Sequence, residues 1–151
     1  MSRLTATANE TDPSRYEATT ARAVGTRRFY RIGCDMDAIV IRELRVEALI
    51  GIHRRERHVM QTLSIDLEIG LPSDAVFASD KVADTIDYEQ VALKIRALAA
   101  SGQYRLVETF ADRIARLLLD DFAAPWAKVS VAKMGILANT RYVGVTIERR
   151  R

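Results

Sequence analysis

The chain has 151 residues, of which 48% are hydrophobic and 28% charged, and its formal net charge is +3. These values are typical of one globular domain with a real core, and no apolar run approaches membrane-spanning length. The basic residues are scattered apart from Arg149–Arg151, so no stripe for nucleic-acid binding is evident. The single cysteine, Cys34, cannot form an internal disulfide, and we expect a reduced, cytoplasmic location.

The chain divides into two parts by composition. Residues 1–35 are rich in threonine, alanine and arginine, have few large aliphatic side chains and show no sustained period. This composition predicts a disordered or loosely attached N-terminal extension. Strand and helix patterns begin just after Met36, so we expect the folded domain to cover residues 36–151.

The first two elements are predicted strands that form an antiparallel hairpin. Residues 39–50 alternate, but the apolar parity changes near Arg42 and Glu43, which indicates a β-bulge. After a polar connection, residues 61–69 alternate cleanly between apolar and polar side chains. The hairpin therefore has one face that can be buried.

Two helices follow. A short helical turn is expected after Ser73 as its N-cap, and a longer helix is predicted over residues 88–100, with Asp87 at its start. The apolar stripe of residues 107–122 predicts a second long helix, which Pro125 ends.

Two further strands are predicted over residues 127–133 and near residues 143–147, so the order is β-β-α-α-β-β. This order predicts an α+β fold with a four-stranded antiparallel sheet and both long helices on one face. The outer strands would remain open edges, and pairing between subunits could close several sheets into a barrel.

Lys133 is the residue that fits its strand least. By the period of two it shares a face with the apolar Val129 and Val131. Desolvation disfavours an ammonium, and a neutral amine near neutral pH is a candidate base. The alternative is a strand-end lysine whose stem covers apolar surface while its head reaches water.

Three other polar residues stand at the ends of predicted elements. Glu108 lies in the first turn of the second long helix. There its carboxylate either stabilises the helix start, through the free N–H groups and the helix dipole, or binds a ligand that has paired N–H donors. Tyr88 opens the first long helix and is either a proton donor or a boundary aromatic. Glu56 lies among arginines between the first two strands. His53 and His58 flank it without a third ligand at firm spacing, so we expect no metal site.

Taken in order, these residues resemble the dihydroneopterin aldolase family of folate biosynthesis. The resemblance runs from about Asp37 to Arg149. Its motifs are Leu49-Ile50-Gly51-Ile52, Glu56, Gln61, Asp84-Thr85-Ile86-Asp87-Tyr88, Leu106-Val107-Glu108, Ala111-Asp112-Arg113-Ile114-Ala115, Lys133, and Val143-Gly144-Val145-Thr146-Ile147-Glu148-Arg149.

The resemblance implies the tunnelling fold, in which such subunits close into a ring whose strands form one barrel. Two tetrameric rings usually stack into a homo-octamer, with active sites between adjacent subunits. The implied reaction is the retro-aldol cleavage of 7,8-dihydroneopterin, a small-molecule pterin, into 6-hydroxymethyl-7,8-dihydropterin and glycolaldehyde. It uses no metal and no organic cofactor, and involves neither nucleic acid nor membrane.

The resemblance also implies roles for particular residues. Glu108 would bind the 2-amino group and adjacent ring N–H of the pterin, and backbone groups around Leu106 and Val107 would line the pocket. Lys133 would act as general base through water, and Glu56 would anchor the substrate side chain and the lysine–water network. From the neighbouring subunit, Ile86 would line the pocket and Tyr88 would relay a proton.

Two other functions stay open. A 2′-epimerase of dihydroneopterin or its triphosphate would use the same residues, because reversal of the cleavage step with the aldehyde turned over gives epimerisation. A non-catalytic, ring-forming module that binds pterins or purines is the alternative of another class.

Overall fold

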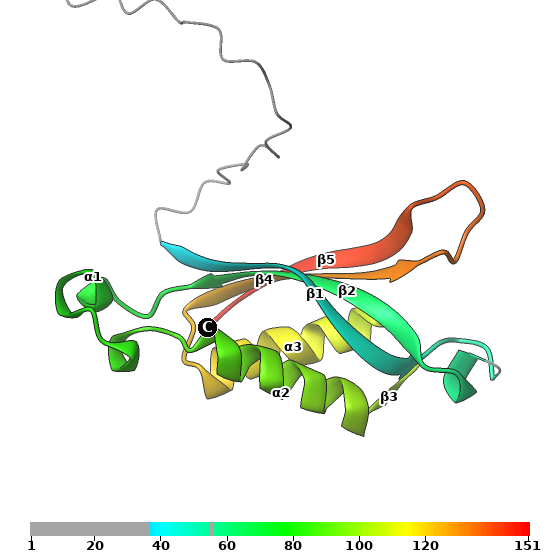
Figure 1. Ribbon diagram of the computed structural model, residues 1–151, viewed down its shortest axis with the longest axis horizontal. Helices are drawn as coiled ribbons and strands as arrows, with labels where there is room; N and C mark the ends of the chain where they lie inside the picture. Colours follow the sequence, from blue (N-terminus) through cyan, green and yellow to red (C-terminus); the bar gives the residue numbers. More distant parts are fainter. Residues whose placement is uncertain (1–36, 55) are drawn as a thin grey trace, which may run out of the picture. The chain divides into compact units, whose positions relative to one another are not determined.

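The computed structural model describes residues 37–54 and 56–151, and Figure 1 shows how the elements are arranged. In chain order they are β1 (Ala38–Ile50), η1 (Glu56–His58), β2 (Gln61–Gly70), α1 (Ala75–Ser79), η2 (Val82–Asp84), α2 (Tyr88–Ser101), β3 (Gln103–Tyr104), α3 (Val107–Asp121), β4 (Trp126–Met134) and β5 (Tyr142–Arg150). The segment 1–35 and Cys34 lie outside the described residues. The domain boundary near residue 36 therefore stays a prediction.

One curled, mixed sheet of five strands organises the fold, in the order β3-β1-β2-β4-β5. The four long strands are antiparallel neighbours, as predicted. The expected four-stranded antiparallel sheet was nevertheless incomplete. A fifth strand, β3, pairs in parallel with the end of β1 through Leu49–Gln103 and Ile50–Tyr104. Two residues carry no readable alternation, so sequence periodicity could not reveal this strand.

The predicted β-bulge in β1 is confirmed. The register against β2 shifts between Ile41 and Leu44, and Glu43 adopts a left-handed backbone with φ of 55°. The side chain of Asp66 stabilises the bulge, because its Oδ1 accepts a hydrogen bond of 2.7 Å from the Glu43 N–H. The bulge returns the following residues of β1 to the correct face, and Leu44, Val46, Ala48 and Ile50 are buried.

The long helices α2 and α3 lie on the same face of the sheet (Figure 1). Between them and the sheet is the core, in which the odd-numbered residues of β2 and β4 meet the apolar stripes of both helices. Burial of each large aliphatic side chain contributes about 1.5–3 kcal/mol relative to exposure. Members with no measurable exposure include Leu63, Ile65, Leu67, Ile95, Phe110, Ile114, Leu118, Val129 and Val131.

The helix ends follow local sequence rules. Asp87 caps α2 as predicted, because its Oδ1 accepts hydrogen bonds from the N–H groups of Glu89 (2.9 Å) and Gln90 (3.1 Å). The short helix α1 was also expected, but its N-cap residue is Asp74 and not Ser73. The Oγ of Ser73 accepts a long hydrogen bond of 3.4 Å from the N–H of Ala75, the first residue of α1.

This arrangement separates the two ends of the sheet. The end of β1, η1, β3 and the start of α3 gather at one end, and α1 with the start of α2 lies at the other (Figure 1). Because β4 runs antiparallel to β2, its last residues also reach the first of these ends, where Lys133 stands opposite Leu63.

Candidate active site

Lys133 lies near the end of β4 on the helix-facing side of the sheet. Its strand alternates as predicted, with Val129 and Val131 fully buried on the same face. The Lys133 side chain is only 13% exposed. A lysine so covered must find polar partners, because desolvation of an unpaired ammonium costs several kcal/mol.

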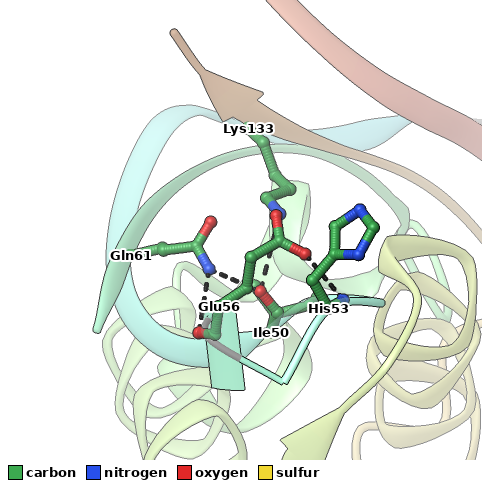
Figure 2. A network of polar contacts seen from close by, with 5 residues as sticks. All are labelled: Ile50, His53, Glu56, Gln61 and Lys133. Atoms are coloured by element: carbon green, nitrogen blue, oxygen red, sulfur yellow. Dashed lines mark hydrogen bonds and ion pairs between the residues drawn. The ribbon is translucent and has the colours of Figure 1, made fainter. Parts of the chain in front are cut away.

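The partners of Lys133 are the last residue of β1 and a residue of the connection between β1 and β2. Its Nζ lies 3.4 Å from Oε1 of Glu56 and donates to the main-chain oxygen of Ile50 at 3.5 Å. Figure 2 shows Glu56, Ile50 and Lys133 meeting in one polar network. The structure thus brings together two of the residues singled out in the sequence, although 77 positions separate them.

Glu56 is held on both carboxylate oxygens. It begins the short helix η1, and its Oε2 accepts a hydrogen bond of 3.0 Å from the N–H of His53. That hydrogen bond lowers the pKa of Glu56, and the positive charge of Lys133 and the nearby His53 lower it further, against an opposing effect of burial. The carboxylate is therefore ionised at neutral pH and forms a true ion pair with Lys133.

Gly51 makes room for Glu56. A Cβ atom at Gly51 would lie 2.2 Å from Cβ of Glu56 and 2.5 Å from its Oε2, closer than atoms pack. The Gly51 backbone does not adopt positive φ, so close approach is the reason for glycine here. The sequence offered Gly51 only as part of a family motif, without this role.

Gln61 completes the network, and no functional role was assigned to it from the sequence. Its Nε2 donates to the main-chain oxygens of Ile50 (2.5 Å) and Glu56 (3.2 Å), as Figure 2 shows. A signal was available, because Gln61 shares the face of Leu63 and Ile65. It is a polar residue at the end of an apolar strand face, the same anomaly that Lys133 presents.

The short strand β3 connects this network to the start of α3. The N–H of Gly51 donates to the oxygen of Tyr104 at 3.1 Å. Tyr104 is itself anchored, because its hydroxyl donates to the oxygen of Leu98 at 3.2 Å and its ring packs against Phe110. The chain then passes directly into the first turn of α3.

That first turn carries three of the predicted pocket residues. Leu106 precedes the helix and is exposed, Val107 is half-buried, and Glu108 is exposed. The carboxylate of Glu108 lies where the free N–H groups of the helix start favour negative charge. These residues are at the same end of the sheet as Lys133, because β3 pairs with the last two residues of β1.

The other two predicted residues are not brought to this end of the same chain. Tyr88 begins α2 and is 66% exposed, and Ile86 just before it is buried in the core. The 14 residues of α2 span about 21 Å, and the helix leads from Tyr88 towards β3. Within one chain, therefore, Tyr88 lies at the opposite end of the helix layer from Lys133.

Two further observations concern the described residues. No group of three or more His, Cys, Asp or Glu residues among them is arranged to hold a metal ion. None of the helices in the described ranges combines the length and the hydropathy needed to cross a membrane.

The fold and the network define an α+β protein with a lysine–carboxylate pair at one end of a curled sheet, equipped for proton transfer. Comparison with known proteins places it more closely. The family model for dihydroneopterin aldolase matches residues 39–148. The chain therefore belongs to the dihydroneopterin aldolase family.

Individual relatives agree with this assignment. The dihydroneopterin aldolase of Escherichia coli K12 is 34% identical over 114 residues, which cover 76% of this chain and 93% of the relative. The crystal structure of the E. coli enzyme in complex with neopterin matches with a TM-score of 0.72 and covers 76% of this chain and 99% of that one. A Burkholderia dihydroneopterin aldolase bound to guanine matches at 25% identity and a TM-score of 0.65, over 78% of this chain and 93% of that one.

Proposed function

We propose that this protein cleaves 7,8-dihydroneopterin into 6-hydroxymethyl-7,8-dihydropterin and glycolaldehyde, as a step of folate biosynthesis, in the cytoplasm. Family membership supports the reaction. The observation that carries the chemistry is the partly buried Lys133, held 3.4 Å from an ionised Glu56. The comparisons favour neither the epimerase nor the non-catalytic binding module.

Lys133 acts as the general base, through a water molecule, on the substrate's 2′-hydroxyl. Removal of that proton breaks the bond between carbons 1′ and 2′ and releases glycolaldehyde. The electrons pass into the dihydropterin ring, so a Schiff base on the lysine is not needed. General-base catalysis of this kind contributes roughly 10²–10⁴-fold to the rate.

Glu56 anchors the hydroxyl-bearing side chain of the substrate. Its Oε1 lies 3.4 Å from Nζ of Lys133, so the same carboxylate can orient the lysine and the water through which it acts.

The start of α3 binds the pterin ring. Glu108 accepts paired hydrogen bonds from the 2-amino group and the adjacent ring N–H, and backbone groups around Leu106 and Val107 line the pocket. The support is positional, since these residues follow β3 directly and β3 pairs with the strand end whose carbonyl Lys133 contacts.

A neighbouring subunit supplies Tyr88, which relays the proton that quenches the enol-type intermediate, and backbone groups at Ile86. Two observations support this part of the proposal. The start of α2 lies about 21 Å along its helix from β3, so Tyr88 of the same chain is too far away. The outer edge of β5, and that of β1 up to Ala48, have no strand partner among the described residues. Pairing of such edges closes a ring of the tunnelling fold, as a tetramer or a stacked octamer.

The decisive test is a product assay. Purified protein supplied with 7,8-dihydroneopterin is expected to release glycolaldehyde and 6-hydroxymethyl-7,8-dihydropterin, resolved by chromatography. Accumulation of dihydromonapterin without glycolaldehyde would reassign the protein as an epimerase. Tight binding of neopterin without turnover would identify a binding module. Sedimentation velocity on the same sample tests whether the protein forms the proposed oligomeric ring. A monomeric protein would contradict this part of the proposal.

Lys133→Met tests the role of the base. We expect kcat to fall by roughly 10²–10⁴-fold while neopterin still binds. Lys128→Met is the matched control, because Lys128 lies on the same strand, on the opposite face, 3.8 Å from Glu68. If both substitutions lower kcat equally, Lys133 has no special role.

Glu108→Gln tests the pocket. The amide cannot accept both pterin donors, so neopterin affinity is expected to fall by roughly tenfold or more. Glu89→Gln, in the first turn of α2, removes a comparable exposed carboxylate and is expected to leave affinity unchanged. Unchanged affinity in Glu108→Gln would refute the pocket assignment.

A further inference from the structure

Gln61 opens β2, and its side chain reaches back across the connection that precedes the strand. Its Nε2 donates to the main-chain oxygens of Ile50, the last residue of β1, and of Glu56, the first residue of η1. The reverse orientation would place an amide oxygen against two carbonyl oxygens, so the hydrogen-bonding pattern fixes the amide. One side chain thus ties the end of β1 to the start of η1, the element that carries Glu56.

Both of those main-chain groups belong to the surroundings of Lys133. The Ile50 oxygen also accepts from Lys133 Nζ at 3.5 Å, and Glu56 supplies the carboxylate at 3.4 Å. The Gln61 side chain is half-buried, as are the contacts it makes. We infer that Gln61 is a positioning residue for the reaction, which holds the Ile50 carbonyl and the Glu56 carboxylate where they orient the Lys133 amine.

This inference rests on the proposed function, and it explains how a ten-residue polar connection keeps a catalytic geometry. Without Gln61, Glu56 would keep its contact with the His53 N–H, but η1 would lose its tie to the end of β1. A displacement of about 1 Å at a reacting group lowers turnover by as much as 10²-fold. The pterin pocket at the start of α3 does not involve Gln61, so ring binding is expected to remain.

Two substitutions separate positioning from general stability. Gln61→Met preserves length and removes both donors, and we expect kcat to fall roughly 10- to 100-fold at every pH. Gln61→Glu preserves shape, but its ionised carboxylate faces two carbonyl oxygens. When protonated, it regains one donor. The titratable groups drawn with Gln61 in Figure 2 are Glu56, Lys133 and His53.

The readout is kcat of each variant divided by that of the wild type, from pH 8 to pH 5.5. Both ratios are expected to lie roughly 10-fold or more below 1 at pH 8, because Gln61→Met offers no donor and the ionised Gln61→Glu sets negative charge against two carbonyl oxygens. The affinity for guanine, which lacks the substrate side chain, should change less than about twofold. Thr62→Val is the matched control, because it removes a cross-strand hydrogen bond to Glu47 from the opposite face of β2.

The outcomes distinguish this inference from the proposed function. A wild-type protein that releases no glycolaldehyde refutes the function. Cleavage by the wild type with unchanged kcat in Gln61→Met refutes the inference alone. So does a kcat of Gln61→Glu equal to that of the wild type, a result that stays informative even if Gln61→Met fails to fold. Equal losses in Gln61→Met and Thr62→Val would reduce Gln61 to a contributor to stability.

Discussion

Gly51→Ala should disable the site through a single methyl group. The added Cβ would lie 2.2 Å from Cβ of Glu56 and 2.5 Å from its Oε2. Ordinary contact between carbon atoms requires roughly 3.5 Å, so Glu56 must move by more than about 1 Å. The Lys133–Glu56 separation is already 3.4 Å, and a shift of this size breaks the ion pair.

We expect kcat to fall roughly 10- to 100-fold, because misplacement of a catalytic group by about 1 Å has effects of this order. Unfolding in urea should show a free-energy loss of about 1–3 kcal/mol, as for other overpacked sites. A double-mutant cycle with Glu56→Gly tests the cause, since that change removes the atoms that clash. In the Glu56→Gly background, Gly51→Ala should cost almost nothing more in kcat. Equal losses in both backgrounds, or unchanged kcat in the single variant, would refute the reasoning.

Three further predictions concern stability. The pKa of Glu56 is lowered in the folded state, so its stabilising contribution is complete above the ordinary value of 4.5 and is lost as the pH falls through the folded-state pKa. Glu56→Gln should therefore flatten the fall in unfolding free energy below pH 4.5, and an unchanged acid limb would contradict this. Ala123→Gly should stabilise the protein by about 0.5–1 kcal/mol in urea unfolding, because Ala123 adopts a left-handed φ of 53° directly after α3, which favours glycine. A loss of stability would show that this backbone conformation does not strain the alanine. Phe110→Ala should cost about 3–5 kcal/mol, since this ring has no solvent exposure; a cost near 1 kcal/mol would mean that the core collapses around the gap.

Much of this fold could be predicted from alternation and capping. The four long strands and the bulge near Glu43 follow from side-chain parity, because one face of the sheet is buried and fixes which residues point inward. The two long helices follow from their apolar stripes. Strand β3 could not be found in this way. Its two residues are selected by main-chain pairing with the end of β1, and main-chain pairing leaves no pattern in side chains.

The site was predictable in part for the same reason. Lys133 was conspicuous because it is a polar residue on the apolar face of its strand, and Gln61 is a polar residue on the apolar face of β2. The roles of Gly51 and the His53 N–H depend on which way Glu56 turns within a polar loop, and no periodic constraint acts there. Tyr88 and Ile86 were assigned to a neighbouring subunit by resemblance. One chain places them far from Lys133, and their roles stay predictions.

The pairing of Lys133 with the β1–β2 connection also has a consequence for folding. Lys133 is separated from Glu56 by 77 positions and from Ile50 by 83. These contacts close long loops, and loop-closure entropy delays such contacts until more local structure has formed. The hairpin of β1 and β2 and the two helices can assemble before β4 is added, but the network around Lys133 cannot. Substitutions in it should therefore speed unfolding and leave the folding rate nearly unchanged. During synthesis, the network around Lys133 can form only after β4 has been made.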